Sequence, residues 1–177
     1  KTHLASGSMS LVQTSIGILE GLKRSSFSLP APEKNEVKVS VQAAALNFKD
    51  ILYALGLLER GAGDPGYFGF ECAGTIVEKG AAVTQFDVGD DVLVCLAYGS
   101  MNSEVNAHAD FVVKRPTTMN AAEGATLPVA YLTAYYGLVQ CGKLQKGERV
   151  LIHAGAGGVG QAAIQLARYI GAEVFAT

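Results

Sequence analysis

The chain is poor in charge and has no long apolar run, and both shortages narrow the classes of protein to which it can belong. Lys, Arg, Asp and Glu make up 17% of the 177 residues, and their formal net charge is −2. This balance provides no basic surface for nucleic acid or for an anionic membrane. No apolar run is long enough to span a membrane, and the N-terminus lacks the apolar core of a signal peptide. A hydrophobic content of 49% predicts a well-buried globular protein.

Cysteine is also scarce. The three cysteines are far apart, are odd in number and form no C-x-x-C pair: Cys72, Cys95 and Cys141. A disulfide framework and a structural zinc site are therefore not expected, and we interpret the cysteines as buried thiols in a reducing cytoplasm. The three histidines, His3, His108 and His153, are isolated as well, which favours surface or structural roles.

A glycine-rich turn near the C-terminus carries the strongest functional signal. Gly155, Gly157 and Gly160 have the G-x-G-x-x-G spacing of a dinucleotide-binding turn. An apolar strand at 150–153 precedes them, and a helical pattern follows that ends at Gly171, before another strand. This order predicts a βαβ unit in which the helix N-terminus binds a pyrophosphate. The alternative is a glycine-rich turn without a ligand.

The rest of the chain divides into two parts by its pattern. Residues 1–8 are small and polar and are interpreted as a linker or an expression remnant. Residues 9–119 contain short strands at regular spacing, which predicts a small β-barrel: strands within 10–28 and at 36–43, 70–79, 88–94 and 109–114, with a short helix within 46–56 and a polar loop at 97–108. Residues 120–177 begin with helices at 120–127 and 128–141, and we interpret them as the start of a cofactor domain.

Several motifs in order make the chain similar to a known family. They are Ala45–Leu52 with Ala54-Leu55-Gly56, Gly69-Phe70-Glu71-Cys72-Ala73-Gly74, Gly89-Asp90-Asp91-Val92, Thr126–Leu138, and Gly147–Ala154 leading into the glycine turn. With them the chain resembles the medium-chain dehydrogenase/reductase superfamily, its zinc-free quinone-oxidoreductase-like branch, and most closely the enoyl reductase domain of a modular polyketide synthase. The resemblance implies an α/β fold: a GroES-like β-barrel-type domain followed by the start of a Rossmann domain with a doubly wound parallel sheet.

The resemblance also bears on metal. Zinc alcohol dehydrogenases of the superfamily carry a Gly-His-Glu motif, where this chain has Gly69-Phe70-Glu71. The upstream cysteine ligand is missing too, because the equivalent segment reads Leu46-Asn47-Phe48-Lys49. We therefore expect no metal site, and hydride transfer from NADPH to an activated C=C bond rather than alcohol oxidation.

The family resemblance assigns candidate cofactor ligands. It places Asn47 and Thr133 at the nicotinamide end of the cofactor, and the glycine turn at its phosphates through Ala154, Gly155, Gly157, Gly158, Val159 and Gly160. For Asn47 the alternative is a helix N-cap. For Thr133 it is a helical threonine that bonds back to its own turn.

The catalytic acid is harder to assign. Many relatives carry a tyrosine two residues after the glycine of the Leu-Gly segment, and here Leu58 occupies that position. Asn47 and Lys49 are the catalytic candidates, although Lys49 and Asp50 could instead form an ion pair or a cap. The family's other candidate acids would lie beyond Thr177, as would the residue that distinguishes NADPH from NADH. We hypothesise protonation from the opposite face or by water, or ring closure by the enolate if the substrate carries a γ leaving group.

Three functions follow as alternatives. The first is an enoyl reductase domain of a polyketide synthase, acting on a phosphopantetheine-bound substrate of an acyl carrier protein beside neighbouring synthase domains in the cytoplasm. The second is a freestanding quinone or enone reductase. The third is a nucleotide-binding module without turnover. The sequence leaves monomer and dimer both open, and its single βαβ unit predicts that a longer polypeptide completes the sheet.

Overall fold

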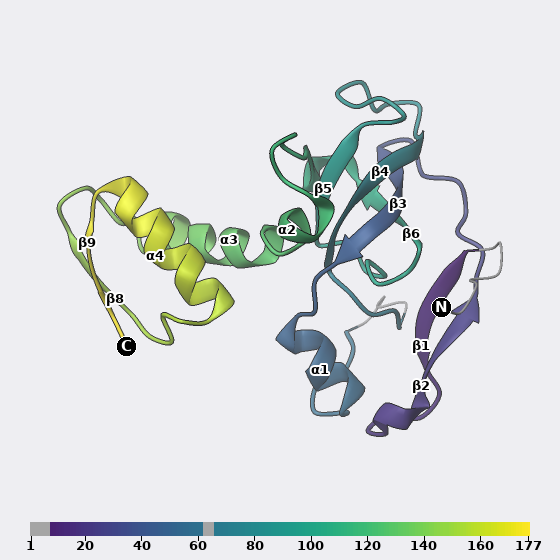
Figure 1. Ribbon diagram of the computed structural model, residues 1–177, viewed down its shortest axis with the longest axis horizontal. Coiled ribbons are helices and arrows are strands. Elements are labelled where there is room, and N and C mark those ends of the chain that lie inside the picture. Colours follow the sequence, from purple (N-terminus) through teal and green to yellow (C-terminus); the bar gives the residue numbers. More distant parts are fainter. Residues whose placement is uncertain (1–7, 62–65) are drawn as a thin grey trace. The chain divides into compact units, whose positions relative to one another are not determined.

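The structure, a computed structural model, describes residues 8–61 and 66–177, which form two compact units (Figure 1). The first unit extends to Thr126 and the second runs from Leu127 to Thr177. Among the described residues, no helix combines the length and the apolar character needed to cross a membrane.

A five-stranded antiparallel sheet forms the body of the first unit, with the strand order β6-β3-β4-β5-β7. The strands are β3 (Glu36–Ala44), β4 (Glu71–Lys79), β5 (Asp91–Cys95), β6 (Glu104–His108) and β7 (Val112–Lys114). Alternate residues point inward, as the period-two pattern predicts, and the buried core includes Val37, Val39, Ile76, Val92, Val94 and Val105. The predicted strands at 36–43 and 70–79 are confirmed to within one residue at each end.

Two sequence predictions in this sheet are wrong. The predicted polar loop at 97–108 ends in strand β6, which pairs with β3. Val105 and Ala107 point into the core, but their short alternation is hidden by three polar neighbours. The predicted strand at 109–114 is shorter, because Ala109–Phe111 forms a 3-10 turn and only Val112–Lys114 pairs with β5.

A hairpin of β1 (Met9–Gln13) and β2 (Leu22–Ser26), with the short 3-10 helix η1 (Leu19–Gly21), lies beside helix α1 (Phe48–Ala54) (Figure 1). The hairpin and the turn within it cap the C-terminus of this helix. The Gln13 side-chain amide and the Gly17 N–H both donate to the Ala54 carbonyl, at 2.7 and 3.0 Å. Gly56 then turns the chain away with a φ of +69°, a conformation that favours glycine.

Helix α2 (Ala121–Ala125) packs on the sheet of the first unit. Asn120 and Glu123 cap its N-terminus reciprocally, each side chain accepting from the other residue's backbone N–H at 2.9 Å. Ala125 is buried with Ala73 and Leu93. The structure therefore places this helix with the strands, whereas the predicted domain boundary at 119/120 precedes it.

The second unit is a βαβ arrangement preceded by a helical segment. Helix α3 (Pro128–Tyr135) continues into a π-helical turn, η3 (Tyr136–Cys141), and is followed by β8 (Arg149–Ile152), α4 (Gly158–Ile170) and β9 (Glu173–Ala176). β8 and β9 pair in parallel. Small side chains bring these elements together around Ile152: Ala134, Ala162, Ala163 and Ala167. Gly171 ends α4 with a φ of +89°, as predicted from the sequence.

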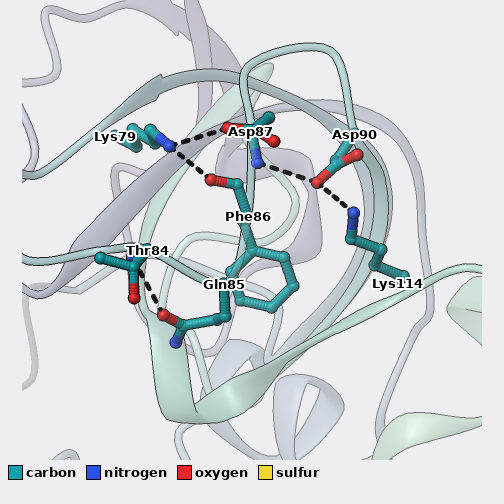
Figure 2. Close-up of polar contacts among 7 residues, drawn as sticks. All are labelled: Lys79, Thr84, Gln85, Phe86, Asp87, Asp90 and Lys114. Carbon is teal, nitrogen blue, oxygen red and sulfur yellow. Dashed lines mark hydrogen bonds and ion pairs between the residues drawn. The ribbon is translucent and has the colours of Figure 1, made fainter.

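An ion-paired turn connects β4 to β5 (Figure 2). Lys79 donates to the Phe86 carbonyl and the Asp87 carboxylate, at 2.6 and 3.0 Å. Asp90 accepts from the Asp87 N–H at 2.9 Å and pairs with Lys114 of β7 at 2.8 Å. The turn therefore ties β7 to the β4–β5 connection through one carboxylate.

We predict that Asp90 makes the first unit sensitive to acid. The hydrogen bonds from Lys114 and from the Asp87 N–H hold the pKa of Asp90 below its ordinary value of 3.8. A lowered pKa contributes stability above the unfolded value and loses it as the pH falls through the folded value. In urea unfolding, the wild type should be more stable than Asp90→Asn at neutral pH, and the difference should vanish in acid. The same substitution type at the exposed Glu20, Glu20→Gln, serves as control, and an Asp90→Asn difference that persists in acid would contradict the prediction.

Candidate active site

The N-terminus of α1 is held by a buried carboxylate. Asp50 is 2% exposed, and its two oxygens accept from the Asn47 N–H at 3.0 Å and from the Gly69 N–H at 2.7 Å. Asn47 is the N-cap residue of α1. Asp50 is thus a cap, as one of the sequence alternatives proposed, and it also joins α1 to the segment before β4. It forms no ion pair with Lys49 in the described part of the chain.

The junction between α1 and the segment before β4 requires glycine at the position of Gly69. Its φ is +91°, and a Cβ there would overlap the backbone of Ser100 and Met101. The next glycine of the same motif, Gly74, faces the Ser40 carbonyl of β3, where a Cβ would also overlap. Both glycines of this motif are therefore explained by close backbone approach.

The amide of Asn47 meets a second buried carboxylate. Its Nδ2 donates to Glu71 Oε1 at 2.9 Å, and Glu71 is 4% exposed. A carboxylate can only accept, so the NH2 group of Asn47 must face Glu71. The pair fixes the orientation of the amide. Glu71 was part of a motif recognised in the sequence, but its contact with Asn47 had no local signal because 24 residues separate them.

Phe70 lies in an aromatic cluster. Its ring is 6% exposed and packs against Tyr53 and Tyr98, with centroid distances of 6.1 and 5.3 Å. The Lys49 ammonium lies over all three rings, at 4.7 Å from the Phe70 centroid, 5.4 Å from Tyr53 and 5.9 Å from Tyr98. Sequence reasoning missed Tyr98, which carries no motif.

The thiols near this site are unreactive. Burial, with a smaller contribution from the Glu71 carboxylate, raises the pKa of Cys72 to about 12 against the opposing effect of a hydrogen bond with Ser100. Burial and the same carboxylate raise the pKa of Cys95 to about 11. Both are therefore protonated thiols at neutral pH and poor nucleophiles or metal ligands. The expectation of buried thiols is wrong for Cys141, which is exposed.

Leu58 lies just after α1 at the position that relatives fill with tyrosine. Its side chain is 40% exposed, and the preceding Leu57 is 70% exposed. Neither leucine can donate a proton. Tyr53 is 5% exposed and belongs to the aromatic cluster instead.

The glycine turn of the second unit has the close contacts that its spacing predicts. A Cβ at Gly160 would overlap the Ala154 carbonyl and the Gly155 Cα, so helix α4 packs directly on the turn. A Cβ at Gly155 would lie 2.9 Å from the Ala176 Cβ of β9. By contrast, no atom lies within 4 Å of the Cβ position at Gly158.

This turn fits the pyrophosphate of a dinucleotide. The N–H groups of Gly158, Val159 and Gly160 belong to the first turn of α4, where helical partners are missing, and no acidic residue lies in that turn. The open space at Gly158 allows close approach to the backbone. Ala154, also a predicted cofactor contact, precedes Gly155 with a φ of +54°.

The remaining candidates lie elsewhere in the second unit. Thr133 is exposed on α3, and within residues 8–61 and 66–177 its hydroxyl has no hydrogen-bond partner, so it does not bond back to its own turn. His153 is exposed and lies 3.1 Å from the Thr177 hydroxyl. The described residues contain no group of three or more His, Cys, Asp or Glu side chains that could hold a metal ion.

Comparisons with known proteins identify the class. Residues 33–117 match the alcohol dehydrogenase GroES-like domain. The highly reducing polyketide synthase tstA of Talaromyces stipitatus is 43% identical over 148 residues, which are 84% of this chain and 6% of that synthase. The crystal structure of CurK enoyl reductase is 42% identical, with a TM-score of 0.91, over 97% of this chain and 54% of that one. Escherichia coli quinone oxidoreductase complexed with NADPH is 30% identical, with a TM-score of 0.83, over 95% of this chain and 52% of that one.

The chain is therefore similar to oxidoreductases of the medium-chain dehydrogenase/reductase superfamily, and its residues 33–117 match that superfamily's GroES-like domain. Within it, the chain resembles the enoyl reductases of polyketide synthases, and the predicted fold class is confirmed. The chain spans about half the length of the matched structures and a small fraction of the matched synthase.

We predict that Asp50 stabilises the first unit strongly. Asp50→Ala removes the acceptor of two N–H groups, one of them fully buried, and should lower the free energy of unfolding by about 3 kcal/mol. Asp50→Asn keeps one acceptor oxygen and should lose less. Urea denaturation measures both, with the exposed Asp110→Asn as control. Equal stability of Asp50→Ala and wild type would contradict this account of the junction.

We predict that two glycines only two residues apart, Gly158 and Gly160, respond differently to the same added methyl group. Gly160→Ala should lower the melting temperature, because its Cβ overlaps the Ala154 carbonyl. Gly158→Ala has open space and should keep the melting temperature while weakening NADPH binding, because the methyl group occupies the phosphate side of the turn. Thermal melts and NADPH fluorescence titration separate the effects. Unchanged NADPH affinity in Gly158→Ala would place the phosphates elsewhere.

Proposed function

We propose that the chain is part of a zinc-free, NADPH-dependent enoyl reductase that reduces the α,β double bond of an enoyl thioester. One observation carries this proposal: Phe70 replaces the histidine of the Gly-His-Glu motif, and the segment Leu46-Asn47-Phe48-Lys49 lacks the upstream cysteine, in a chain whose glycine turn has the close contacts of a dinucleotide-binding turn. Without those ligands, a carbonyl cannot be polarised by zinc, and a conjugated double bond is the better hydride acceptor.

Each unit, taken by itself, contains groups suited to part of a dinucleotide cofactor. The first-turn N–H groups of α4 suit the pyrophosphate, and Thr133 offers an unpaired hydroxyl for the nicotinamide end. Asn47, with its NH2 turned to Glu71, offers its Oδ1 as an acceptor for a carboxamide or ribose donor. When bound, NADPH would supply the hydride. The choice of NADPH rests on the similarity to a quinone oxidoreductase complexed with it.

The substrate class follows from the similarity to polyketide synthases. In that setting the enoyl group would be bound as a phosphopantetheine thioester to an acyl carrier protein, beside neighbouring synthase domains in the cytoplasm. A freestanding quinone or enone reductase is the second candidate, favoured by the similarity to the quinone oxidoreductase. Leu58 in place of tyrosine keeps ring closure by the enolate as a third outcome, for substrates with a γ leaving group.

The test uses the full-length protein with NADPH deuterated at the transferred position. Crotonyl-pantetheine, a quinone and a γ-chlorinated enoyl thioester are offered in parallel, and products are identified by mass spectrometry. We expect deuterium at the β-carbon of a saturated thioester. Reduction of the quinone alone would favour the second candidate, and a cyclopropane product from the chlorinated substrate would favour ring closure. Tight NADPH binding without any product would contradict a reductase.

A further inference from the structure

The ammonium group of Lys49 has an unusual environment in the first unit. Lys49 and Tyr53 are four residues apart and lie on the same face of α1. From that face the ammonium lies over the rings of Phe70, Tyr53 and Tyr98. The three rings come from α1, the segment before β4 and the segment after β5. The charge is therefore placed by three separate parts of the fold.

No acceptor in the described part of the chain uses this ammonium. Within residues 8–61 and 66–177, Lys49 forms neither an ion pair nor a hydrogen bond. The two carboxylates near α1 are already engaged: Asp50 accepts from two backbone N–H groups, and Glu71 accepts from the Asn47 amide. The residue is exposed, so the donors of Lys49 are accessible to a ligand.

The rings position the charge without consuming its hydrogen bonds. A cation–π contact attracts the ammonium to the faces of the rings and restricts a flexible side chain. Ordering a free lysine side chain costs conformational entropy. Because the cluster meets part of this cost in the folded protein, an oxygen ligand would find the ammonium already in place.

We propose that Lys49 is the electrophile of the reaction: its ammonium donates a hydrogen bond to the carbonyl oxygen of the enoyl thioester. The inference rests on the proposed function and identifies the group that takes over the polarising role of zinc. The ammonium lies 4.7 Å from the ring of Phe70, the residue that stands where zinc-dependent relatives have a histidine ligand. A fixed positive charge is thus retained at this place in the fold.

In the proposed hydride addition, the β-carbon gains a C–H bond from the hydride. The π electrons of the C=C bond move to form an enolate, whose oxygen becomes negative. Lys49 keeps its proton and stabilises that oxygen by a charge-assisted hydrogen bond. The α-carbon then takes a proton from solvent, and the saturated thioester and the oxidised cofactor are released. The hydride donor is the reductant of the proposed function.

Lys49→Met in the full-length protein tests this role, with Lys49→Arg retaining the charge and Lys38→Met, in the surface pair with Glu78, as the matched control. Two substrates are compared: crotonyl-pantetheine, whose enolate oxygen needs the ammonium, and 1-nitrocyclohexene, whose nitronate is a much more stable anion because two oxygens share its negative charge. We expect kcat for the thioester to fall about 100-fold in Lys49→Met, as on removal of one oxyanion-stabilising donor. Nitroalkene reduction and NADPH affinity should change little, and Lys49→Arg should recover most of the thioester activity.

A second variant tests the cluster without removing the charge. Phe70→Leu should lower thioester turnover by a smaller factor than Lys49→Met and should again spare the nitroalkene. Equal loss on both substrates would show a structural role for Lys49 and overturn the proposal. A loss of NADPH affinity would assign the ammonium to a cofactor phosphate and also overturn it. Unchanged thioester turnover in Lys49→Met, with an active wild type, would sink this inference alone, whereas an inactive wild type would sink the proposed function itself.

Discussion

The rest of the site depends on the two hydrogen bonds that the buried Asp50 carboxylate accepts. It joins the first turn of α1 to the backbone at Gly69, and so fixes two segments that are 19 residues apart. Asn47 and Lys49 on one side, and Phe70 and Glu71 on the other, are held in place by that junction. Because the carboxylate is buried and accepts two short hydrogen bonds, it can be neither moved nor lost without disturbing all four side chains.

The site contains a buried acid, Glu71, although the described residues hold no group of side chains that could bind a metal ion. Glu71 stays buried and is paired with a neutral amide, so the pair itself carries a negative charge. Burial is the main cause of the raised pKa of Cys72 and Cys95, and the Glu71 carboxylate adds to it. Lys49 supplies the positive charge of α1, and the aromatic rings hold it without neutralising it. The arrangement separates a buried structural acid from an accessible cation.

The sequence predicted those features that depend on local pattern. The glycine spacing, the period-two strands and the helix end at Gly171 follow from backbone sterics that neighbouring residues encode. It did not predict β6, whose inward residues Val105 and Ala107 alternate for only two steps. Nor did it predict the contacts of Asn47 with Glu71 or of Lys49 with Tyr98, because these depend on how distant strands pair. The family resemblance pointed to Asn47 and Lys49 as site residues, but it gave no contact partner for either side chain.

Leu58 and Lys49 together separate two tasks that one acidic side chain can perform in a reductase. An ammonium can stabilise an enolate oxygen without protonating the α-carbon, and a leucine at the family tyrosine position leaves that carbon without a donor from this segment. On the proposed function, the enolate would then persist until solvent or another acid reaches it. Its lifetime would decide the product, since a longer-lived enolate has time to displace a γ leaving group. The missing tyrosine at the position of Leu58 would thus determine which product forms. The ammonium of Lys49 would determine the rate of hydride transfer.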